Sequence, residues 1–132
     1  FCLAVKESEN SVTCWGSGSP MREFMHVDDL AEAVFFCLRN WKPNYNNAPL
    51  DDNKKPLNFL NVGTGKEISI KELAEKIAMH AGFKGVINWD NSKPDGTPRK
   101  RLNVDKLNSL GWQAKIKLDE GIKATIKEFQ RT

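Results

Sequence analysis

The sequence lacks the glycine motifs through which proteins commonly hold the phosphates of a nucleotide. Neither the GxGxxG turn of dinucleotide-binding domains nor the GxxxxGK(S/T) phosphate loop occurs in its 132 residues. The two histidines, His26 and His80, have no partner at metal-ligand spacing, and no Ser/His/Asp or Cys/His set is apparent. Taken alone, the residues indicate binding groups without a catalytic centre, a metal site or a cofactor pocket.

Long apolar runs and a strong charge of one sign are also missing. The chain has 20 basic and 17 acidic residues, and its formal charge of +3 is far from the basic stripe typical of nucleic-acid-binding proteins. No apolar stretch is long enough to span a bilayer. Cys2, Cys14 and Cys37 are too widely spaced for a CxxC metal site, so we expect reduced, packed thiols of a cytoplasmic protein.

Turn-forming residues divide the chain into short segments, which together predict a small mixed α/β domain over residues 1–132. Strands are expected over residues 12–15, 22–27, 57–62 and 86–89, and a polar, variable loop over residues 40–56. Helices are expected over residues 1–9, after a cap at Asp28 or Asp29, and over residues 70–81, 105–110 and 118–129. Ser69 and Glu72 form a capping box, and Gly82 occupies the usual position of a helix-ending glycine. Because no Met begins the chain, we expect it to be a piece of a longer protein.

Two clusters contain side chains suited to a phosphorylated, ring-bearing ligand. Trp15 lies beside a glycine turn, where the backbone can approach a ligand closely. Arg22 follows that turn, and its planar guanidinium suits bidentate contact with a phosphate. The second cluster, residues 93–101, joins a Pro-Asp-Gly turn at Asp95 to four cations, among them Lys100.

Each of these residues also has an ordinary structural interpretation. Trp15 fits a core position equally well, and Arg22 fits a surface or ion-paired arginine. Asp95 is a common turn former, and the basic loop fits a solvated face. His26 is better explained as a packed, hydrogen-bonded residue than as a catalyst, because a general base needs an oriented partner.

Three sequence blocks nevertheless resemble the GDP-L-fucose synthase family within the extended short-chain dehydrogenase/reductases. The first is WGSGSPMREFMHVDDLA, over residues 15–31, and the second joins NVGTG (61–65) to SIKELA (69–74). The third, DNSKPDGTPRK over residues 90–100, is the most specific, and Gly111-Trp112 and LDEG (118–121) follow in the expected order. The resemblance covers essentially the whole chain except the loop 40–56. Asn103 stands where the family commonly has Asp, which we expect to affect a helix cap.

The resemblance implies an NADP-dependent enzyme with an N-terminal Rossmann domain, of which this chain is the C-terminal, substrate-binding portion. Such enzymes epimerise GDP-4-keto-6-deoxy-D-mannose and reduce its ketone with NADPH to give GDP-L-fucose. The family's catalytic Ser, Tyr and Lys, with the Cys and His of epimerisation, would precede Phe1. The fragment alone is therefore expected to be inactive and to bind no NADP.

Carried over by motif position, Trp15, Arg22 and Asp95 match nucleotide-sugar contacts of the family, and Lys100 is a further candidate. The expected partner is a GDP-sugar, without nucleic acid or membrane, and the full-length protein is expected to be a cytoplasmic homodimer. Two alternatives stay open. One is the C-terminal domain of another NAD(P)-dependent sugar-nucleotide epimerase or dehydratase; the other is a non-enzymatic nucleotide- or RNA-binding module.

Overall fold

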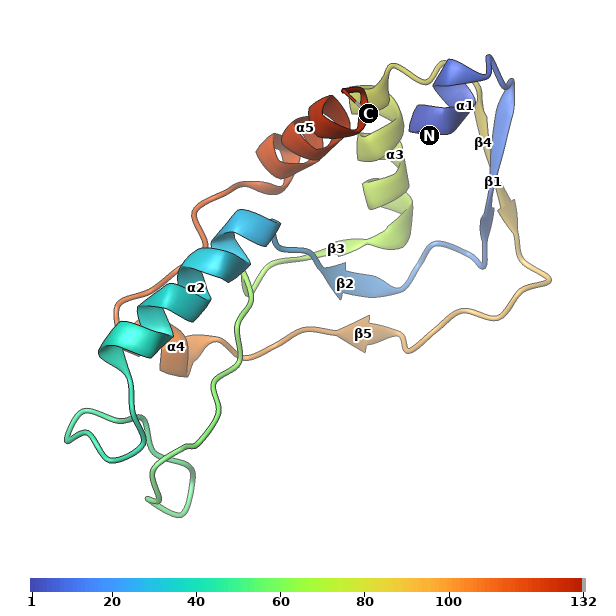
Figure 1. Ribbon diagram of the computed structural model, residues 1–132. Helices are drawn as coiled ribbons and strands as arrows, with labels where there is room; N and C mark the ends of the chain where they lie inside the picture. The colour runs from blue at the N-terminus through green and yellow to red at the C-terminus, as the bar shows by residue number, and fades with distance from the viewer. Residues whose placement is uncertain (132) are drawn as a thin grey trace. The chain divides into compact units, whose positions relative to one another are not determined.

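The computed structural model describes residues 1–131, which form short strands and helices (Figure 1). In chain order the elements are α1 (Cys2–Lys6), β1 (Ser11–Trp15), β2 (Met21–Glu23), α2 (Val27–Asn40), β3 (Glu67–Ser69), α3 (Ile70–Ala81), β4 (Val86–Asp90), β5 (Arg99–Lys100), α4 (Asp105–Ser109) and α5 (Leu118–Phe129). The predicted mixed α/β fold class is confirmed. None of the helices within residues 1–131 is long and apolar enough to cross a membrane.

The chain divides into two compact units. The first comprises Phe1–Arg22, Glu67–Arg101 and the residues from Lys117 onward, and the second comprises Glu23–Lys66 and Leu102–Ile116. The prediction that residues 1–132 act as one nucleotide-sugar-binding domain stays a prediction.

Two small sheets organise the first unit. β1 and β4 pair in parallel, with Ser11 opposite Val86 and Trp15 opposite Asp90. The second sheet has the order β3-β2-β5, and β2 and β5 are parallel. The predicted strands at residues 12–15 and 86–89 are thereby confirmed, whereas β3 and β5 were not expected. Strands this short form only because distant segments pair with them.

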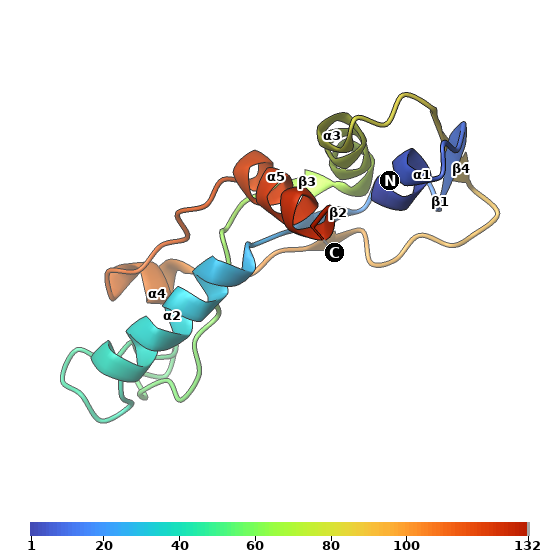
Figure 2. The same cartoon turned by 45° about the horizontal axis from the view of Figure 1, so that its top comes forward.

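α3 of the first unit begins and ends at residues that the sequence identifies. The hydroxyl of Ser69 accepts a hydrogen bond from the Glu72 backbone N–H, and the Glu72 carboxylate accepts one from the Ser69 N–H. Gly82 ends α3 with φ 75°. α3 lies beside α5 in both ribbon views (Figures 1 and 2). The buried positions of α3 are all alanine, and such small side chains allow two helices to approach closely.

The second unit encloses a small apolar core. Ala33 of α2, Leu107 of α4 and Trp112 are buried together. The apolar residues packed around them are Met25, Phe36, Cys37, Leu60, Val62 and Ala114. The predicted strand over residues 57–62 is wrong, because no strand forms there. Its alternating apolar residues Leu60 and Val62 instead contribute to the core without a partner strand.

The start of α2 differs from the expectation that an aspartate caps it. His26 is the N-cap, and its Nδ1 accepts a hydrogen bond from the Asp28 N–H at 3.2 Å. Asp29 is buried instead, and its carboxylate accepts hydrogen bonds from the backbone N–H groups of Lys115 and Ile116. The interpretation of His26 as a hydrogen-bonded structural residue is therefore supported, and the aspartate cap is wrong.

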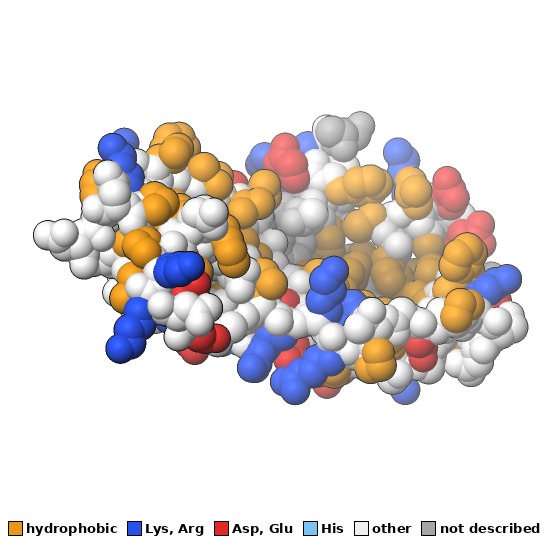
Figure 3. Space-filling model, turned by 90° about the horizontal axis from the view of Figure 1, so that it is seen from below, with side chains coloured by type: hydrophobic (Ala, Val, Ile, Leu, Met, Phe, Trp, Pro, Cys, Tyr) orange, Lys and Arg blue, Asp and Glu red, His pale blue; other side chains and the backbone are white. Residues whose placement is uncertain are grey.

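α2 buries only one side of its apolar surface. Ala33 is fully buried and Cys37 half-buried, but the relative exposure of Leu30, Val34 and Leu38 is 45%, 50% and 72%. Figure 3 shows one face of the molecule, on which hydrophobic side chains are exposed among charged ones. The helix predicted from the apolar periodicity is thus present, but only part of its predicted apolar face is buried.

Candidate functional site

The end of β1 presents an aromatic ring to solvent. Trp15 is the last residue of β1, and its relative exposure is 75%. The interpretation of Trp15 as a core residue is therefore wrong. The ammonium of Lys93 lies 5.7 Å from the centroid of the Trp15 ring, a cation–π distance.

A glycine turn follows Trp15 and is held by Asp95. Gly16 and Gly18 have φ values of 80° and 74°, which favour residues without a Cβ. One carboxylate oxygen of Asp95 accepts from the Ser17 backbone N–H at 2.9 Å, and the other accepts from the Ser17 hydroxyl at 2.6 Å. Hydrogen bonds from the side chain and then the backbone of Ser17 lower the pKa of Asp95. Asp95 is therefore an ionised acceptor at neutral pH, with lone pairs left for a ligand.

Arg22 and Lys100 are direct neighbours across the second sheet. They are register partners in the β2–β5 pair, so their side chains leave the same face of the sheet. Neither forms an ion pair with another residue of the described chain. The guanidinium of Arg22 donates to the Met21 carbonyl at 2.7 Å and lies over Gly96, where an added Cβ would be 3.1 Å from Nη2. Two uncompensated cations therefore lie side by side.

The four predicted site residues belong to the first unit and are linked by short connections. Asp95 is hydrogen-bonded to the turn that follows Trp15, and the Arg22 guanidinium lies beside Gly96, the next residue. Lys100 lies opposite Arg22. The cations can bind phosphate oxygens, and the aromatic face and the carboxylate can contact a ring and its polar hydrogens. That these residues contact a nucleotide sugar stays a prediction.

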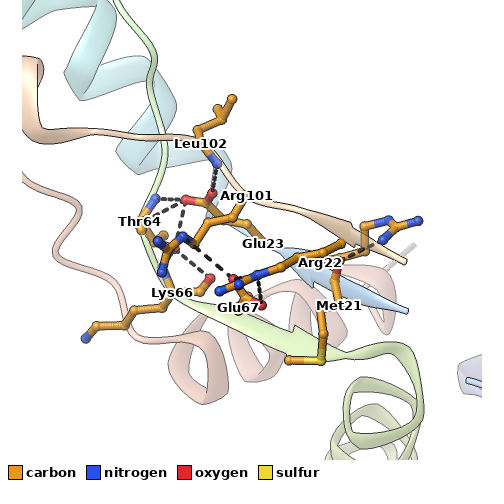
Figure 4. A network of polar contacts seen from close by, with 10 residues as sticks. Met21, Arg22, Glu23, Thr64, Lys66, Glu67, Arg101 and Leu102 are labelled. Atoms are coloured by element: carbon orange, nitrogen blue, oxygen red, sulfur yellow. Dashed lines mark hydrogen bonds and ion pairs between the residues drawn. The ribbon is translucent and has the colours of Figure 1, made fainter. Parts of the chain in front are cut away.

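Sequence reasoning missed a carboxylate immediately beside Arg22. Glu23 accepts hydrogen bonds from the backbone N–H groups of Thr64, Gly65 and Leu102, the last two at 2.6 Å and 3.0 Å (Figure 4). Partial burial raises the pKa of Glu23, but these backbone bonds outweigh it and leave the pKa below its usual value. The Glu23 carboxylate thereby stabilises the turn at residues 63–65, within the second unit. The sequence signal was an acidic residue inside an expected strand.

The comparisons with known proteins agree with this architecture. Residues 1–49 match the NAD dependent epimerase/dehydratase family. GDP-L-fucose synthase 1 of Arabidopsis thaliana is 46% identical over 95% of this chain, and the GDP-L-fucose synthase of Escherichia coli (strain K12) is 43% identical over 98% of it. A GDP-L-fucose synthetase structure from Naegleria fowleri, bound to NADP, has 25% identity and a TM-score of 0.79 over 98% of the chain.

Sequence and fold are thus similar to part of an NAD-dependent epimerase or reductase, in agreement with the prediction. Within that class the chain is similar to GDP-L-fucose synthases, and the predicted resemblance is confirmed. The chain spans 35% of the length of the Arabidopsis protein, 39% of the Escherichia coli protein and 37% of the Naegleria chain.

Proposed function

We propose that this chain is the substrate-binding portion of an NADP-dependent GDP-L-fucose synthase. The complete enzyme would convert GDP-4-keto-6-deoxy-D-mannose to GDP-L-fucose by epimerisation and reduction. The observation that carries the proposal is the pair of uncompensated cations, Arg22 and Lys100, beside an exposed tryptophan and an ionised aspartate. Similarity to GDP-L-fucose synthases over nearly the whole chain supports the same function.

Each of the four residues would have a separate role in holding the GDP-sugar. Arg22 and Lys100 would neutralise the diphosphate, because a guanidinium can form two parallel bonds to phosphate oxygens and an ammonium adds a point charge. Trp15 would offer an apolar ring face, and Asp95 would accept hydrogen bonds from a sugar hydroxyl or a base N–H. The site would therefore bind and orient the substrate.

NADP does not fit the residues of this chain. No GxGxxG turn between a strand and a helix is present to take the pyrophosphate, so no step of the reduction is assigned to residues 1–132. The cofactor would be bound by another part of the complete protein. On the family resemblance, that protein would be a cytoplasmic homodimer.

The test is calorimetric titration of the protein with GDP. Replacing Arg22 by Gln, or Lys100 by Gln, should each weaken the affinity about tenfold, the effect of losing one charge-assisted contact of ~1.4 kcal/mol. Arg131→Gln is the matched control, because it removes the same charge from an exposed residue paired with Glu128. Equal GDP affinity in all variants would refute the proposed diphosphate site.

A further inference from the structure

β5 contains cations that point in alternate directions. Arg99, Lys100 and Arg101 follow one another along the chain, and successive side chains of an extended segment leave opposite faces. Lys100 shares the face of its register partner Arg22. Arg99 and Arg101 therefore leave the other face of the sheet.

Both arginines are bound by a single acid on the far side of β2. Nε of Arg99 lies 2.8 Å and 2.9 Å from the two carboxylate oxygens of Glu67, and Nε of Arg101 lies 3.6 Å from one of them. The Glu67 side chain is only 14% exposed. The hydrogen bond and the charge of Glu67 both raise the pKa of Arg99. Since β3 and β5 flank β2, this contact reaches across the middle strand.

Arg22 takes no part in that cluster. Figure 4 shows its guanidinium directed away from Glu67, whereas the Arg101 side chain extends toward Glu67. The two faces of the sheet thus differ electrostatically. One has its cations neutralised by Glu67, and the other leaves Arg22 and Lys100 without an ion pair in the part of the chain that the structure describes.

We propose that Glu67 is a positioning residue for the diphosphate site, because its contacts with Arg99 and Arg101 fix Lys100 beside Arg22. This inference rests on the proposed function. β5 has two residues, and a strand pairing this short is at best marginally stable without further contacts. The ion pairs of Glu67 secure the residues on both sides of Lys100, so they fix its register against Arg22. They also keep two arginines away from the face where the anion binds.

The test compares GDP affinity in single and double variants. Glu67→Gln should weaken GDP binding about fivefold, although it removes a negative charge near the site, and Arg99→Gln should weaken GDP binding by a similar factor. The double variant should bind GDP with about the affinity of the single variant that binds it less tightly, because both changes break the same contact between Glu67 and Arg99. Glu67→Asp, which retains the charge, should recover most of the affinity and serves if Glu67→Gln does not fold. Glu128→Gln is the matched control, since it removes the charge of an exposed acid on α5 that pairs with Arg131.

Two results would overturn the positioning role. One is native-like GDP affinity in Glu67→Gln; the other is a double variant whose loss equals the product of the two single losses. Failure of the proposed function is separate, because the unchanged protein would then bind no GDP. In that case amide hydrogen exchange tests the positioning role without a ligand. Faster exchange confined to β2 and β5 in Glu67→Gln supports the positioning role, and unchanged exchange refutes it.

Discussion

Ser17 and Asp95 lie 78 positions apart in the sequence and are joined by two hydrogen bonds, of 2.9 Å from the Ser17 N–H and 2.6 Å from its hydroxyl. These bonds connect the glycine turn after β1 to the Pro-Asp-Gly turn of the basic loop. The two clusters that the sequence shows separately therefore form one surface within the first unit. The ionisation of Asp95 becomes a measure of whether that surface is assembled.

Replacing Ser17 by Ala should raise the pKa of Asp95 toward its ordinary value, because the strongest cause of its lowering is the Ser17 hydroxyl. A lowered carboxylate pKa stabilises the fold above the ordinary pKa, and the stabilisation is lost as the pH falls through the folded value. Carboxyl NMR titration measures the change. Ser92→Ala is the control, since the Ser92 hydroxyl bonds Asp90 instead. An Asp95 titration unaffected by Ser17→Ala would contradict the assignment.

Replacing Gly18 by Ala should lower the free energy of unfolding by about 3 kcal/mol. About 1 kcal/mol comes from the positive φ, and about 2 kcal/mol comes from overpacking. An added Cβ would lie 2.6 Å from the Trp89 ring. Gly82 has a similar φ of 75°, but a Cβ added there would meet nothing within 4 Å. Gly82→Ala should therefore lower the free energy of unfolding only by the cost of the positive φ. Urea unfolding of both variants measures the difference, and equal costs would show that the Trp89 contact is absent.

Asp29→Ala should destabilise the fold by about 3 kcal/mol, because it leaves buried backbone donors without an acceptor. Asp29 is 2% exposed and accepts from the N–H groups of Lys115 and Ile116. Asp28→Ala, one residue away and exposed, should cost about 0.5 kcal/mol through the helix dipole. Chemical unfolding measures both values. Similar costs for the two aspartates would contradict the structural role given to Asp29.

Asp119 should make the contact between α3 and α5 sensitive to acid. Hydrogen bonds from His80 and then Lys76 lower the pKa of Asp119 from 3.8 to about 2. Because the folded pKa is the lower one, this stabilisation is complete above pH 3.8 and is lost as the pH falls through about 2.

The measurement compares urea midpoints of the native protein and Asp119→Asn between pH 7 and pH 2. The variant should be less stable at pH 7, and the gap should close toward pH 2. Glu120→Gln is a neighbouring control that leaves the His80 and Lys76 contacts in place. A gap that persists at the lowest pH would contradict the account.

Local signals predicted the elements that depend on local energetics. The capping box at Ser69, the glycine after α3 and the amphipathic period of α5 all act within a few residues. α5 accordingly spans Leu118–Phe129 as expected. Asn103, expected to affect a helix cap, accepts a hydrogen bond from the Asp105 N–H at the start of α4.

The missed features depend on contacts between distant residues. β5 exists because it pairs with β2, and a two-residue strand has no periodicity to detect. The segment 57–62 has the alternation of a strand, but only Leu60 and Val62 are used, in the core around Trp112. The acceptor roles of Glu23 and Asp29 are set by backbone groups that lie 41 to 87 positions away. For the proposed site, motifs selected Trp15, Arg22, Asp95 and Lys100 as candidates, whereas no motif pointed to Glu67.

The most direct test of the central claim is an NMR titration of the protein with GDP, followed at the Trp15 indole, Arg22, Asp95 and Lys100, with UDP as the control nucleotide. We expect shifts at these residues with GDP at lower concentration than with UDP, because the proposed ligand is a guanine nucleotide sugar. Equal shifts with the two nucleotides, or no shifts at these four residues in the folded protein, would contradict this claim.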